Sequence, residues 1–229
     1  MSDIAHTSVY SSELIESLLK EQVILFNKQT EAQFSASKQI FLASQSLKLP
    51  EKLPQLATQY VAEFLQKVVL KDPAIVCLLA LVSLSIANKV SFSCPKVTQS
   101  IQSLALEKFT FEQVVTTERF FIEKLNWKLE RKTVCDACEV LITLVFKKLD
   151  LELLRLSNYY ASYVYLELRC FSALIMGAVC VNRALEKRGS SKELTVWKSF
   201  LKNSENLDSS ELKYASLLLE SSAQLCGLN

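Results

Sequence analysis

The cysteines and the single histidine are the first residues to weigh for catalysis or metal binding. The chain has seven cysteines, and Cys135 and Cys138 have the C-x-x-C spacing found in zinc and redox sites. A zinc site needs two further ligands, but there is no second C-x-x-C pair, and His6 lies near the N-terminus, where chains are usually poorly ordered. The same histidine would have to serve any Ser-His-Asp or Cys-His arrangement. We therefore predict that Cys135 and Cys138 are helix-core residues, and that the protein binds no metal and is not an enzyme.

Glycine is too scarce for the common nucleotide sites. The chain has 3 glycines in 229 residues, and the first of them is Gly177. Dinucleotide, P-loop and kinase glycine-rich loops need glycine where the backbone approaches phosphate closely. The sequence excludes these classes, and we expect no cofactor.

The charge pattern disfavours nucleic acid and membrane as partners. The net charge is +2, with cations and acids interspersed, so there is no basic footprint for a phosphate backbone. The densest basic stretch (Lys124, Lys128, Arg131, Lys132) also contains Glu123 and Glu130, and we interpret it as solvated surface. The uncharged run Ala74 to Ala87 is shorter than the roughly 20 residues of a membrane helix, which predicts a buried core helix. An odd number of cysteines and no cleavable apolar N-terminal segment favour a reduced, intracellular protein.

Two charged residues lie on apolar stripes. Glu118 is in the middle of a helical stripe made by Phe111, Val114, Val115, Ile122 and Leu125, and Lys89 continues a stripe made by Ile75, Leu78, Leu79, Val82 and Ile86. An unpaired charge among apolar neighbours is costly, so such residues are usually paired or presented to a partner. Spacing leaves two interpretations open. The two residues face each other, or Lys89 extends into solvent from a helix end and Glu118 lies at a stripe edge.

The elements that carry these residues are helices throughout. Apolar periodicity and start signals predict an all-α protein of about eleven helices, with no convincing strand pattern. Thr110 with Gln113 and Ser190 with Glu193 are typical helix starts, and residues 126–132 form a connector. The predicted helices are 12–28, 31–46, 54–70, 74–91, 95–104, 110–125, 133–148, 150–169, 171–187, 191–203 and 208–225.

Several segments resemble the cyclin box. Leu81 to Lys89 (LVSLSIANK) is similar to the family's third helix, which ends in Ile-Ala-x-Lys, and Thr110 to Leu129 is similar to its fifth helix and exit. Leu47 to Leu65 resembles the loop and second helix. The resemblance, clearest over 30–147, implies a cyclin fold: an N-terminal tail and helix (1–29), a first cyclin box (30–130) and a divergent second helical domain (131–229).

The resemblance also implies a binding site. In cyclins, Lys and Glu at the positions of Lys89 and Glu118 grip main-chain groups around the movable helix of a cyclin-dependent kinase, and the matching contacts here are Val90, Ile122, Trp127 and Leu129. An apolar wall holds that kinase helix so that the phosphoryl-transfer site is complete. A cyclin performs no chemistry itself.

Two departures point to one branch of the family. Lys89-Val90-Ser91-Phe92 lacks the aromatic and two acids that most cyclins have after the lysine, and Glu31 to Leu47 lacks the usual substrate-docking run. Both features resemble the cyclin N-terminal-domain-containing proteins of meiotic crossover sites. This implies a nuclear protein of meiotic chromosomes that promotes crossover maturation with a kinase and other pro-crossover proteins. A scaffold that activates no kinase is the alternative, and the even charge balance argues against a DNA-binding factor of the general transcription type.

Overall fold

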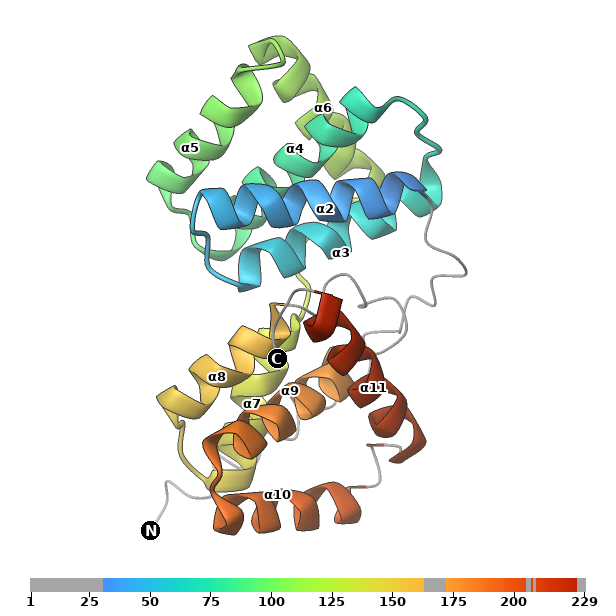
Figure 1. The fold of residues 1–229 in the computed structure, drawn as a ribbon. Coiled ribbons are helices and arrows are strands. Elements are labelled where there is room, and N and C mark those ends of the chain that lie inside the picture. The colour runs from blue at the N-terminus through green and yellow to red at the C-terminus, as the bar shows by residue number, and fades with distance from the viewer. Residues whose placement is uncertain (1–30, 163–171, 205–206, 208, 226–229) are drawn as a thin grey trace. The chain divides into compact units, whose positions relative to one another are not determined.

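The protein is described by a computed structural model that covers residues 31–162, 172–204, 207 and 209–225 (Figure 1). The described residues form helices joined by short connections, with no strand among them. The chain divides into two compact units, one ending at Arg131 and the next beginning at Lys132. We call them the first and second unit. The predicted helix at 12–28 and the residue His6 lie outside the described ranges.

The first unit is built around one central helix. Helix α4 (Pro73–Ser91) packs against all four of its companions, which are α2 (Glu31–Ser46), α3 (Lys52–Lys67), α5 (Pro95–Leu106) and α6 (Phe111–Lys124). Its residues 78–88 are buried, with Leu84 and Ala87 completely enclosed. Length and composition alone would let α4 cross a membrane, but most of it lies inside this bundle. The prediction of a buried core helix at Ala74 to Ala87 is confirmed.

Side-chain caps define where the helices begin. Asp72 accepts a hydrogen bond from the Ala74 amide just before Pro73, whose missing N–H costs nothing at that position. Thr110 forms a reciprocal capping box with Gln113 at the start of α6, as predicted. The predicted helix start at Ser190 is confirmed, because Ser190 directly precedes α10, but its side chain makes no capping hydrogen bond, and the Glu193 carboxylate lies 3.7 Å from Arg188.

Aromatic packing joins α3 to α6. The Phe64 ring stacks on Phe121 with centroids 4.9 Å apart and meets Phe120 edge-on at 5.8 Å. Phe64 and Phe121 are both buried. Such pairs add about 0.5–1.5 kcal/mol beyond the apolar area they bury, so this contact fixes the orientation of α6 on the core.

The second unit repeats the plan with α9 at its centre. Helix α9 (Ala173–Arg188) packs against α7 (Val134–Phe146), α8 (Leu151–Ala161), α10 (Ser191–Asn203) and α11 (Ser209–Leu225). At Gly177 the two helices α7 and α9 come so close that a Cβ would lie 2.7 Å from the Cβ of Ala137. This glycine is required by the close approach.

The two central helices carry matching residues near their C-terminal ends. Asn88 and Lys89 of α4 correspond to Asn182 and Arg183 of α9 in order and position. Lys89 pairs with Glu118 of α6, the last helix of its unit, and Arg183 pairs with Glu220 of α11, the last helix of the other. The same cation-to-acid arrangement therefore occurs in both units, consistent with a duplication.

Left-handed backbone occurs at connections that glycine would normally occupy. Five non-glycine residues of the described chain have positive φ, against one glycine, Gly189. The five are Lys48, Ser93, Asn126, Trp127 and Lys147. A left-handed conformation costs a non-glycine residue about 1–2 kcal/mol, so the surrounding structure must hold each of them.

Candidate functional site

Lys89 and Glu118 form an ion pair on the first unit. The Lys89 Nζ lies 2.5 Å from Glu118 Oε1, although 28 residues separate the two along the chain. The side chains are 43% and 19% exposed, respectively. Of the two interpretations that the sequence leaves open, the structure supports the one in which they face each other.

The end of α4 positions Lys89. The buried Asn88 side chain donates to the Cys94 carbonyl at 2.9 Å and to Thr98 Oγ1 at 2.8 Å, which fastens the turn between α4 and α5. Ser93 lies in this turn with a φ of 46°, and its hydroxyl donates to the Lys89 carbonyl. The backbone that carries Lys89 is therefore fixed by the helix before it and by the hydrogen-bonded turn after it.

Glu118 belongs to the edge of the buried face of α6. The residues of α6 that pack in the core are Val114 and Phe121, and Leu125 continues their row at the helix end. Glu118 falls between them at helical spacing. Its side chain is consequently mostly shielded from solvent, with 19% of it exposed.

The apolar stripe predicted on α6 is only partly buried. Phe111 is 66% exposed and Val115 is 47% exposed, while Ile122 is partly buried. The apolar stripe is wider than the core it meets. Val114 therefore packs in the core, whereas Phe111 and Val115 form an exposed apolar row on the same helix as Glu118. Ile75, which belongs to the stripe predicted on α4, is also exposed, at 45%.

The residues after each helix add to this surface. Val90 and Phe92 are exposed at the end of α4. Trp127 is 70% exposed in the turn after α6, where its amide donates to the Ile122 carbonyl at 3.1 Å. Leu129 is partly buried against the core, and its carbonyl accepts a hydrogen bond from the Tyr60 hydroxyl.

We name this surface the pair face. It comprises the ion pair and the exposed or partly buried apolar residues of the segments that carry it, which are α6, the end of α4 and the turn after α6: Lys89, Val90, Phe92, Phe111, Val115, Glu118, Ile122 and Trp127. Three of these, Phe92, Phe111 and Val115, were missed as site residues. The signal was available, because Phe111 and Val115 share the stripe that contains Glu118.

An apolar surface around a small charged centre is suited to binding another protein. Exposed aromatic and aliphatic residues bury area on association, and a charge pair at the centre fixes register. The other candidate residues serve packing: Cys135 and Cys138 are buried in α7 and Cys180 in α9, whereas Cys77 and Cys94 are partly exposed. The remaining cysteines, Cys170 and Cys226, lie outside the part of the chain that the structure describes.

The chain resembles known proteins in structure more than in sequence. A search of curated proteins by sequence found no match. Among solved structures, the chain is similar to a viral cyclin from herpesvirus saimiri, with a TM-score of 0.75 and 17% identity over 93% of this chain and 96% of that one. This likeness establishes the cyclin fold.

The family itself is shown by a match over more than half of the sequence. The family model described as "Cyclin, N-terminal domain" matches residues 6–130, which include the pair face. Together with the helical bundle around α4, this match establishes that the chain belongs to the cyclin N-terminal domain family.

Proposed function

We propose that this protein is a non-enzymatic regulatory subunit that binds a cyclin-dependent kinase through the pair face. The observation that carries the proposal is the Lys89–Glu118 ion pair beside the exposed Phe111 and Val115. A partner that covers this face would bury the charged centre and the apolar flank together. In kinases, holding the αC helix in place completes the phosphoryl-transfer site.

The ion pair contributes more to binding than to folding under this proposal. An ion pair that is partly open to solvent is worth about 0–1 kcal/mol to stability. Truncating one member of a pair that a partner has buried costs about 2–5 kcal/mol of binding, much of it from the charge left unpaired. The two magnitudes differ enough to separate an interface role from a structural one.

The experiment compares binding and stability in the same variants. Lys89→Ala and Glu118→Ala should each weaken co-purification with a purified cyclin-dependent kinase by thirty-fold or more, on the order of 2 kcal/mol, while the free energy of unfolding changes by less than about 1 kcal/mol. The matched control is Arg119→Ala, which breaks the exposed Arg119–Glu123 pair at 2.9 Å on the same helix. Unchanged kinase binding in both test variants would remove the pair face from the proposal.

A cyclin-fold scaffold is the second candidate. Lys89 is followed by Val90-Ser91-Phe92 instead of an aromatic and two acids, which removes two carboxylates from the position next to the ion pair. Such a surface favours binding without activation. If the kinase bound to this protein phosphorylates a peptide well above the rate of the isolated kinase, the scaffold hypothesis fails.

The cellular role we propose is crossover maturation on meiotic chromosomes, together with other pro-crossover proteins. The support is the Lys-apolar-Ser-Phe segment at Lys89 to Phe92. The tagged protein should then form foci on the chromosomes of meiotic nuclei, and the proteins purified with it from meiotic cells should include crossover factors. A diffuse cytoplasmic signal in meiotic cells would contradict this role.

A further inference from the structure

The exposed Trp127 lies in the turn after α6, where the amides of Asn126 and Trp127 donate to the carbonyls of Glu123 and Ile122. Asn126 and Trp127 follow each other with φ values of 53° and 60°. Each left-handed non-glycine residue carries a conformational cost, and such residues persist only where surrounding contacts fix them. Trp127 itself is 70% exposed, so its own side chain supplies little of that fixation.

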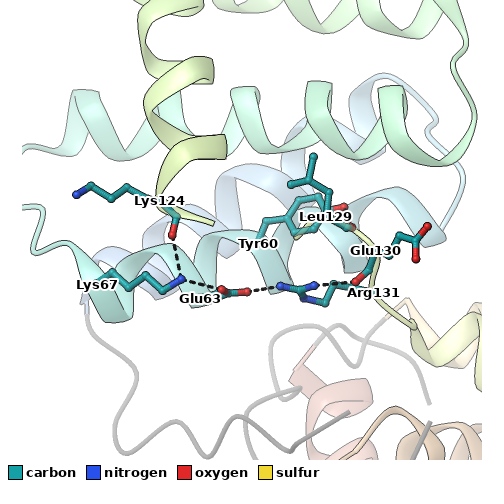
Figure 2. A network of polar contacts seen from close by, with 7 residues as sticks. All are labelled: Tyr60, Glu63, Lys67, Lys124, Leu129, Glu130 and Arg131. Carbon is teal, nitrogen blue, oxygen red and sulfur yellow. Dashed lines mark hydrogen bonds and ion pairs between the residues drawn. The ribbon is translucent and has the colours of Figure 1, made fainter. Parts of the chain in front are cut away.

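Three side chains of α3 contact the segment on both sides of this turn (Figure 2). The Lys67 Nζ donates to the Lys124 carbonyl at 2.9 Å, before the turn. The Tyr60 hydroxyl donates to the Leu129 carbonyl, after the turn. Glu63 lies between them and accepts from Arg131 at 2.6 Å. We name Tyr60, Glu63, Lys67 and Arg131 the clamp.

The clamp is connected by charge as well as by position. Glu63 accepts from Lys67 at 2.9 Å through one carboxylate oxygen and from Arg131 through the other. Its side chain is 15% exposed, so this centre is screened less than a surface pair. Arg131 also donates to the Glu130 carbonyl, which fixes the chain at the end of the segment. Arg131 is thus a structural residue, and its interpretation as plain solvated surface is wrong.

These contacts bracket the turn. Lys67 fixes the Lys124 carbonyl before the turn, and Tyr60 and Glu63 fix Leu129 and Arg131 after it. The short stretch of backbone from Lys124 to Leu129 is then held at both ends. Asn126 and Trp127 lie within it and adopt the left-handed conformation. Tyr60 also needs this partner, since a buried hydroxyl without a hydrogen bond costs about 1–3 kcal/mol.

We infer that the clamp residues Tyr60, Glu63, Lys67 and Arg131 are positioning residues that preorganise Trp127 for its partner. The inference rests on the proposed function, because it assigns Trp127 to the surface that the kinase covers. A preorganised side chain binds more tightly because it loses less conformational entropy when the partner associates. The clamp residues need not touch the partner to affect its affinity.

The first test measures Trp127 without any partner. The chain has two tryptophans, and Trp197 is buried in the second unit. Incorporation of 5-fluorotryptophan therefore gives two fluorine NMR signals, which a Trp127→Phe variant assigns. In Tyr60→Phe/Glu63→Gln, the Trp127 signal should narrow and shift toward that of free 5-fluorotryptophan, while the Trp197 signal stays in place. An unmoved Trp127 signal in the folded variant would overturn the inference.

Two further variants keep this test decisive. Arg119→Gln breaks an exposed pair on α6 and should leave the Trp127 signal unmoved. Tyr60→Phe alone removes a single hydroxyl, so it serves if the double variant does not fold, and it should shift Trp127 in the same direction by a smaller amount. If Arg119→Gln shifts Trp127 as far as Tyr60→Phe does, the clamp has no special role.

The second test measures kinase binding in a double-mutant cycle. The Tyr60→Phe/Glu63→Gln change should weaken binding to a purified cyclin-dependent kinase by about ten-fold in the wild-type background and by less than about two-fold in a Trp127→Ala background. Equal losses in both backgrounds would show that the clamp does not act through Trp127. If the wild-type protein binds no kinase, the proposed function fails, and the NMR result still decides whether the clamp holds Trp127.

Discussion

At the scale of single residues, the contacts around Glu63 change the pKa of its carboxyl. Burial opposes its charge, but hydrogen bonds from Lys67 and Arg131, together with the guanidinium charge, outweigh burial and lower the pKa of its carboxyl below the ordinary value of 4.5. A carboxylate with a lowered pKa stabilises the fold wherever it is ionised. Its contribution is present above pH 4.5 and is lost as the pH falls through the lower, folded-state pKa.

The pH dependence of one substitution tests this. At pH 7, Glu63→Gln should lower the free energy of unfolding by about 1.5–3 kcal/mol, the range of a hydrogen bond to a charged group. As the pH falls through the lowered folded-state pKa, the wild-type carboxyl also loses its charge, so the difference between the two proteins should shrink toward zero. Denaturant unfolding of both proteins at pH 7 and pH 3 measures it, and a difference that does not change with pH would contradict the assignment.

At the scale of single helices, α6 shows what a sequence can predict. Its limits, its capping box and the position of Glu118 follow from residue type and spacing. The division of its apolar stripe does not, because which residues pack depends on where α3 and α4 lie. The clamp was also beyond prediction: Tyr60 and Leu129 are 69 residues apart, and no local pattern connects them.

The capping box at the start of α6 gives a prediction at this scale. Thr110→Ala removes the acceptor for the Gln113 amide, which should cost about 1 kcal/mol of stability. The first turn carries Phe111, so its fraying should also weaken kinase binding. Thr110→Ser keeps the hydroxyl and is the matched control. Thermal unfolding and binding of both variants check the prediction, and equal effects of Ala and Ser would exclude the cap as the cause.

At the scale of the whole molecule, the two units have separate cores. Phe64 and Phe121 belong to the core of the first unit, whereas Cys138, Gly177 and Trp197 belong to that of the second. The pair face lies on the first unit alone. Damage to the second core should therefore leave the structure of the pair face intact.

Gly177→Ala tests this independence. The added methyl would lie 2.7 Å from Ala137 Cβ and 3.3 Å from the backbone of Ala137 and Cys138. Overpacking of this kind costs about 1–3 kcal/mol, against a gain of about 1 kcal/mol in helix propensity, so we expect a net loss. Hydrogen exchange should accelerate in α7 and α9 and stay unchanged in α4 and α6. Adding Ala137→Gly should restore part of the stability, and faster exchange throughout α4 would contradict separate cores.

The left-handed residues at helix ends also have a practical consequence for protein engineering. Lys147 ends α7 with a φ of 58°, and Lys48 follows α2 with a φ of 51°; both are exposed, and neither belongs to the pair face. Glycine adopts this conformation without steric cost, so Lys48→Gly and Lys147→Gly should each raise the midpoint of urea unfolding, by an amount worth up to about 1 kcal/mol. The two substitutions should give a more stable version of the chain for crystallisation, with every residue of the pair face unchanged.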